Sequence, residues 1–185
     1  MSKSNGNENQ TNKMKKIENL LKGGDLRSIG QSNKIVSFID NQASFDELFQ
    51  QLFHADRIVV MRSADAIEKI IRKNAGFLKK HKAEILQLCG TATHIELKWH
   101  LALIVSRLDL TKKEAGNAWQ ILAGWAIDKN ESKIVRVNAI QALFNLQKIK
   151  QEWKEDFKLV ILQVEKEHIP SINARIKKIK NASVK

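Results

Sequence analysis

The segment that decides the fold covers residues 135–146 and reads VRVNAIQALFNL. Its apolar side chains recur at spacings of 4, 4 and 3 residues, which places them on one face of an α-helix. These residues are Val135, Ala139, Leu143 and Leu146. The same stripe occurs 38 residues earlier, beginning at Leu97, and again 38 residues before that, beginning at Val59. The pattern predicts a helix that repeats along the chain.

A second apolar series has a period of 37 residues and lies between the members of the first. Its members are Leu48, Ile85, Leu122 and Leu159. Each repeat is therefore predicted to hold two helices, which we name helix A and helix B in chain order. Such a pair cannot bury its apolar face alone, and stacking on neighbouring pairs buries it. With only 8 Gly and 1 Pro, the composition also favours long helices over many short strands. We predict an all-α chain folded as a right-handed α-solenoid of about four to five helical pairs.

Local signals predict where several helices begin and end. Capping-box patterns, in which a hydroxyl and a carboxylate bond the first amides of a helix, begin at Ser44, Thr93 and Thr111. Gly76 and Gly90 are predicted to lie in gaps between helices. Pro170 is predicted to open the last B helix, where a missing amide is tolerated.

The two ends of the chain differ from the repetitive part. Residues 1–12 are rich in Ser, Asn and Gln and are predicted to be a disordered tail. Residues 13–180 are predicted to form one solenoid domain, followed by a basic C-terminal end at residues 181–185. Near the start of the domain, a helix around Ile17 is predicted to stop at Gly23. A short helix is predicted to follow at residues 33–40.

The repeat resembles the HEAT repeat. Asp128, followed by Val135-Arg136 with Ala139 and Leu143, is similar to the inter-helix Asp and the Val-Arg, Ala, Leu pattern of HEAT second helices. The two earlier copies are degenerate, because one has Val60 and the other Lys98 where the pattern has Arg. Residues 17–180 as a whole resemble small stand-alone bacterial HEAT-like (armadillo-type) proteins, a group with no established activity. The resemblance implies a fold and leaves the function open.

The net charge of +12 is concentrated at the two ends of the chain. Residues 1–30 carry +3 and residues 171–185 carry +5, so the 140 residues between them carry only +4. No apolar run reaches the roughly 18 residues of a membrane span, and the polar N-terminus does not read as a secretory signal. A single cysteine, Cys89, excludes an internal disulfide and is expected to be a small buried hydrophobe. We expect a cytoplasmic protein.

The B helices supply the predicted binding residues. If they line the concave side of the stack, the polar positions between their apolar stripes form a ladder from one repeat to the next. The ladder residues are Arg62, Asp65, Lys69, His100, Arg107, Asn138, Gln141 and Asn145. The simpler interpretation is the solvated side that every amphipathic helix has. The ladder nevertheless predicts a non-catalytic interaction module, either scaffold or adaptor, that holds a segment of a partner protein.

Nucleic-acid binding is the alternative function. HEAT-like DNA glycosylases act on alkylated bases, and that resemblance would cast Asp65, Arg62, Trp99 and Arg107 as the residues of a base-binding cleft. The apolar stripe Ile172, Ile176 and Ile179, flanked by basic residues, could bind an acidic surface or could simply close the last repeat. No sequence motif indicates catalytic residues, the histidines lack metal-ligand spacing, and no cofactor is expected.

Overall fold

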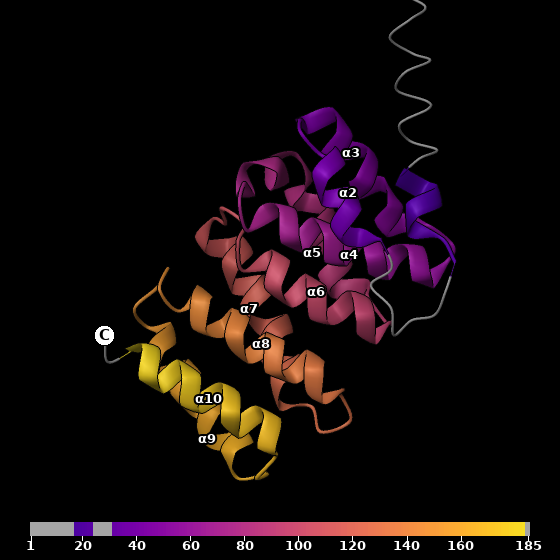
Figure 1. Ribbon diagram of the computed structural model, residues 1–185. Coiled ribbons are helices and arrows are strands. Elements are labelled where there is room, and N and C mark those ends of the chain that lie inside the picture. The colour runs from indigo at the N-terminus through magenta and orange to yellow at the C-terminus, as the bar shows by residue number, and fades with distance from the viewer. Residues whose placement is uncertain (1–16, 24–30, 184–185) are drawn as a thin grey trace, which may run out of the picture. The chain divides into compact units, whose positions relative to one another are not determined.

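A computed structural model describes residues 17–23 and 31–183 of the chain, and every regular element in these ranges is helical (Figure 1). The predicted tail of residues 1–12 and the end of the C-terminal segment, residues 184–185, lie outside the described residues. The described helices fall into two compact units that divide between Phe77 and Leu78. Each unit is described by itself below.

The first unit is built around one long helix. Residues 17–21 are helical, and Gly23 has a φ of 76°, the left-handed conformation in which helices commonly end. The elements that follow are α2 (Ser32–Phe38), α3 (Gln42–Gln50), the 3₁₀ helix η1 (Gln51–Phe53) and α4 (Arg57–Ile71). Helices α2, α3 and η1 all pack against α4. The 3₁₀ helix η2 (Ala75–His81) includes the division between the units.

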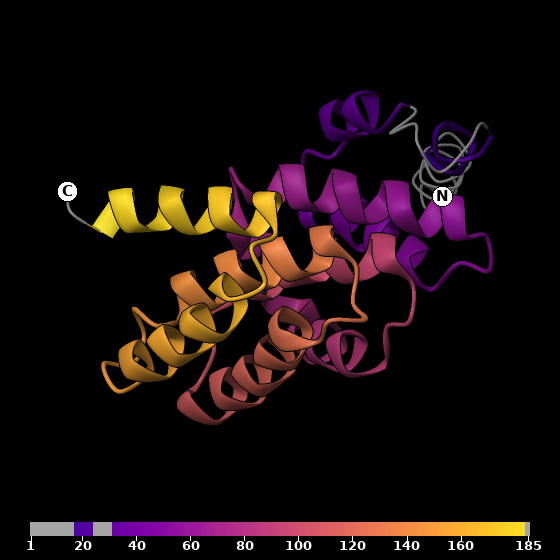
Figure 2. The same cartoon turned by 90° about the horizontal axis from the view of Figure 1, so that it is seen from below.

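The second unit consists of six helices in two layers. They are α5 (Lys82–Thr91), α6 (Ile95–Val105), α7 (Lys112–Ile127), α8 (Lys133–Leu146), α9 (Trp153–Glu165) and α10 (Pro170–Ser183). The A helices α5, α7 and α9 pack in succession in one layer, and the B helices α6, α8 and α10 pack in succession in the other (Figures 1 and 2). Four A-B pairs, α3/α4 to α9/α10, confirm the predicted repeat and the α-solenoid class.

The predicted B-helix stripe is the core of both units. Val59, Leu97 and Val135 open the three copies and are 0%, 6% and 0% exposed. The A-helix series holds for its first three members, Leu48, Ile85 and Leu122, which are at most 1% exposed.

The fourth A-helix anchor is wrong. Leu159 is 65% exposed, and Phe157, Ile161 and Val164 face the core instead. Helix α9 begins 41 residues after α7 (153 − 112), not 37, so the turn that faces the core lies at different positions from those the period predicts.

The predicted helix ends are correct in part. Thr111 and Glu114 form the predicted capping box of α7, and Pro170 is the first residue of α10. At α3 the box is instead formed by Asn41 and Ser44, because the helix starts earlier than predicted. At α6 the cap is His94, which makes no side-chain cap bond, so the predicted box at Thr93 is absent. Gly90 lies in the last turn of α5, not in a gap.

Candidate interaction surface

The predicted ladder is less exposed than a solvated stripe would be. Four of its eight residues are buried: Arg62, Asp65, His100 and Asn138 are between 1% and 8% exposed. The other four, Lys69, Arg107, Gln141 and Asn145, are half-buried. The expectation of a solvent-facing stripe is therefore corrected, because helices and loops of the same chain cover much of it.

In the first unit, the predicted site residues hold the N-terminal helices onto α4. The Arg62 guanidinium donates to the main-chain oxygens of Leu21 and Lys22, at 2.8 Å and 3.0 Å. These carbonyls end the helix at residues 17–21, where a cation also meets the negative end of the helix dipole. Arg62 thus fixes a segment that lies 41 residues earlier in the chain.

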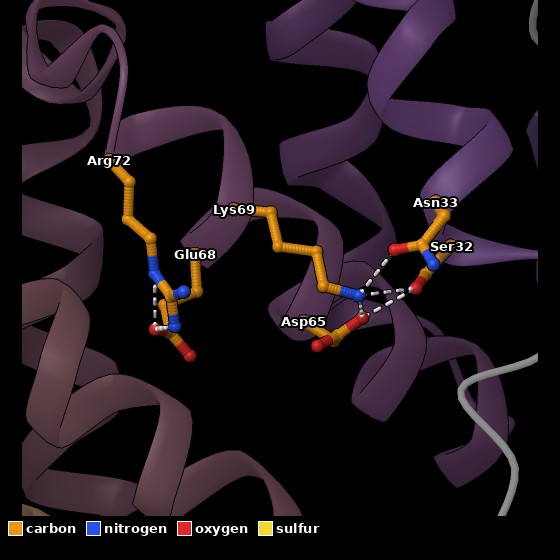
Figure 3. Close-up of polar contacts among 6 residues, drawn as sticks. All are labelled: Ser32, Asn33, Asp65, Glu68, Lys69 and Arg72. Atoms are coloured by element: carbon orange, nitrogen blue, oxygen red, sulfur yellow. Dashed lines mark hydrogen bonds and ion pairs between the residues drawn. The ribbon is translucent and has the colours of Figure 1, made fainter.

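Asp65 and Lys69 make the equivalent connection to α2 (Figure 3). Ser32 Oγ donates to Asp65 Oδ2 at 2.5 Å, and Lys69 Nζ lies 2.6 Å from the same oxygen. The ammonium also reaches Asn33 Oδ1 at 2.8 Å. Ser32 is fully buried. All three predicted site residues of α4 thus have partners within the first unit, and these partners belong to the segments that cover the helix.

In the second unit, a chain of side-chain hydrogen bonds joins the three B helices. Arg175 of α10 donates to Gln141 Oε1 of α8 at 2.9 Å. Gln141 Nε2 donates to Asn145 Oδ1 at 3.1 Å, and Asn145 Nδ2 donates to Ser106 Oγ, just after α6, at 3.3 Å. All four side chains are half-buried, so the chain of bonds follows the surface across the layer. Sequence analysis proposed Gln141 and Asn145 but missed Ser106 and Arg175.

Two cation-carboxylate contacts connect successive pairs of the second unit. Arg136 is 2% exposed and bonds both carboxylate oxygens of Glu167, at 2.8 Å and 2.7 Å. Its Nε also donates to Ala126 O, at 2.9 Å, near the end of α7. One repeat earlier, Lys98 pairs with Glu131.

Both carboxylates lie in the loop between helix A and helix B of the following repeat, where the HEAT pattern has its acidic residue. The resemblance singled out Arg136 and Lys98, but sequence alone did not reveal either partner. Asp128, which the resemblance also singled out, instead accepts a bond from the main chain of Asn130.

These contacts lower the pKa of two carboxyl groups. Arg136 holds the pKa of Glu167 below its ordinary value of 4.5. The side chain of Lys82, together with Thr111, lowers the pKa of Glu114 from 4.5 to about 2. In both cases the charged form of the carboxyl group accepts the hydrogen bond and is therefore favoured in the folded chain.

Acid is therefore expected to destabilise the protein through these groups. A carboxyl whose pKa is lower folded than unfolded contributes fully above the unfolded value and loses its contribution as pH falls through the folded value. Denaturant unfolding measured between about pH 6 and pH 2 should show stability falling with pH. The Glu167→Gln variant should be less stable than wild type near neutral pH and should show a weaker pH dependence. An unchanged pH dependence in that variant would contradict the assigned contact.

The remaining sequence expectations concern single residues. Cys89 is 3% exposed, and burial raises its pKa to about 12, which keeps the thiol protonated and unreactive. The isoleucine stripe of α10, Ile172, Ile176 and Ile179, is at most 5% exposed, so packing within the second unit occupies it. Among the described residues, no cluster of His, Cys, Asp and Glu could hold a metal ion. None of the helices in the described ranges is both long and apolar enough to cross a membrane.

Comparison with known proteins identifies the family. The profile of the HEAT repeat domain matches residues 17–183, which include nearly all the helices described above. The chain belongs to the HEAT repeat family. No curated protein and no solved structure matches it.

Proposed function

We propose that this protein is a non-catalytic interaction module that holds an extended segment of a partner protein on the B-helix layer of its second unit. The observation that carries the proposal is the chain of hydrogen bonds from Arg175 through Gln141 and Asn145 to Ser106. It crosses three successive helices of a repeat family whose members commonly act through extended surfaces.

The chemistry of these side chains suits a peptide backbone. An amide side chain both donates and accepts hydrogen bonds, so Gln141 and Asn145 can each pair with a backbone N–H or C=O. Half-burial favours the same role, because a fixed side chain loses less conformational entropy on binding than a fully solvated one. Arg107 lies on the neighbouring helix segment and donates to Leu103 O at 2.6 Å.

The buried ladder residues take a supporting role in this proposal. Arg62, Asp65 and Lys69 fix the N-terminal segments on α4, and His100 and Asn138 lie beneath the surface of α6 and α8. Their replacement would act on the fold as well as on binding. A binding test should therefore avoid them.

Paired alanine variants test the surface. Replacing both Gln141 and Asn145 with Ala should weaken a captured protein partner about tenfold or more, in the range of interface hot spots. Stability should fall only modestly, because each hydrogen bond contributes about 1 kcal/mol net. The matched control replaces Asn117 and Gln120, an exposed Asn and Gln on α7, with Ala. Equal partner retention by both double variants would place the binding surface elsewhere.

Nuclease treatment of the captured material separates the alternative function. Partners that survive nuclease support the interaction module, and loss of all partners supports nucleic-acid binding. The glycosylase alternative needs a carboxylate open to a flipped base, whereas Asp65 is 8% exposed and accepts bonds from Ser32 and Lys69. Release of an alkylated base by the wild type, lost on Asp65→Asn, would favour that alternative nonetheless.

Electrostatic affinity for DNA should reside mainly at the basic ends. Deleting residues 1–12 and neutralising the five basic residues of 171–185 removes most of the local positive charge. Any weak binding to duplex DNA should then disappear, and in the wild type it should fall steeply with salt. The measurement is a filter-binding or anisotropy titration at several salt concentrations. Tight binding by the neutralised variant would contradict the assignment of the affinity to the ends.

A further inference from the structure

The second unit contains an apolar groove that its own packing does not fill. Helices α9 and α10 diverge from their connecting loop (Figure 2), and the groove between them has a volume of about 640 Å³. This volume is within the roughly 300–1,000 Å³ range of ligand pockets. Its apolar lining is Phe144, Phe157, Ile161, Leu162, Ile176 and Ile179.

The rim of the groove is positively charged. Lys154, Lys158 and Lys180 line it, against a single carboxylate, Glu165. Lys180 and Glu165 pair at 2.6 Å and so join α10 to α9. Together, α9 and α10 carry six basic and three acidic residues, which leaves a net charge of +3 around an apolar floor.

The groove is also open to solvent along α9. Leu162, which lines it, is 58% exposed. A large apolar side chain held at the edge of a groove gains contact area only when something covers it, and an open groove between two helices accepts an amphipathic helix through residues spaced i, i+3, i+4 and i+7.

We propose that this groove binds an amphipathic α-helix of a partner protein, with apolar side chains facing the groove and acidic side chains flanking them. The charge of the rim selects this occupant. Residues 1–16 of the chain itself carry four lysines and one glutamate, so they would be repelled. A second copy docked about a two-fold axis would set two positive rims against each other. The acidic helix alone complements both the floor and the rim.

This surface is distinct from the hydrogen-bond chain of the B-helix layer, and the proposal does not rest on the function proposed above. The groove uses α9 and the C-terminal half of α10, whereas the hydrogen-bond chain uses Ser106, Gln141, Asn145 and Arg175. Variants of one surface should therefore leave binding at the other intact.

The test uses the full chain and two synthetic helical peptides. The first carries leucines at the i, i+3, i+4 and i+7 positions, flanked by glutamates, and the second has the same leucines with every glutamate replaced by lysine. Fluorescence anisotropy should show saturable binding of the acidic peptide that weakens as salt rises, and much weaker binding of the basic one. Absence of saturable binding by the acidic peptide at millimolar concentration, or equal affinity for both peptides, overturns the proposal.

Helix α9 offers a matched pair of variants. Leu162 lines the groove and Leu159 does not, yet both are exposed, so neither substitution should unfold the chain. Leu162→Glu and Lys154→Glu should each weaken the acidic peptide about tenfold or more, while Leu159→Glu should leave its affinity within about twofold. Circular dichroism verifies that each variant is folded. If Leu159→Glu weakens binding as much as Leu162→Glu, the contact is a non-specific one and the groove is not the site.

Discussion

Replacing Arg136 with Met is expected to lower the free energy of unfolding by about 3–5 kcal/mol, the range measured when one partner of a buried ion pair is removed. The guanidinium is 2% exposed and holds both carboxylate oxygens of Glu167 and the carbonyl of Ala126. Its loss leaves a largely buried carboxylate and a main-chain acceptor without their partner. Urea denaturation near neutral pH measures the change.

Two companion variants make this result specific. Removing Glu167 as well, in the Arg136→Met, Glu167→Leu double variant, should recover part of the loss, because two apolar groups can replace a buried pair at little net cost. Lys158→Met removes a cation whose pair with Glu155 is exposed on both sides, so it should change stability by no more than about 1 kcal/mol. Equal losses for Arg136→Met and Lys158→Met would contradict the assigned role of the buried pair.

Replacing Leu122 with Ala is expected to cost about 2–5 kcal/mol through lost transfer energy and a cavity in the core of α7. Leu122 is 1% exposed and is the third member of the 37-residue series. The fourth member, Leu159, is 65% exposed and serves as the control. Leu159→Ala should change stability by no more than about 0.5 kcal/mol. Similar losses at both positions would mean that the assigned helix phase is wrong.

The sequence predicts the fold well wherever a single helix determines the pattern. The B-helix stripe depends only on spacing within one helix, and all of its copies are buried as predicted. Leu159 fails because the phase of α9 depends on where that helix begins, which a fixed period does not specify. Thr93 fails for a similar reason, since His94 takes the cap position and α6 begins at Ile95.

The candidate surface was only partly predictable because its state depends on distant partners. A polar stripe on a helix looks the same in sequence whether it is solvated or covered. Arg62 is covered by carbonyls 41 residues away, and Ser32 reaches Asp65 across 33 residues. The groove between α9 and α10 is less visible still, because it arises from the divergence of two helices and not from any local pattern.

The contacts of Lys98 with Glu131 and of Arg136 with Glu167 give the chain a direction. In each, the cation comes first and its carboxylate follows 33 or 31 residues later, in the next repeat. During synthesis the ribosome therefore releases each cation before the residue that neutralises it. Helix α8 can reach its final stability only after Glu167 has left the exit tunnel, so assembly of this part of the chain is tied to translation from the N-terminal side onward.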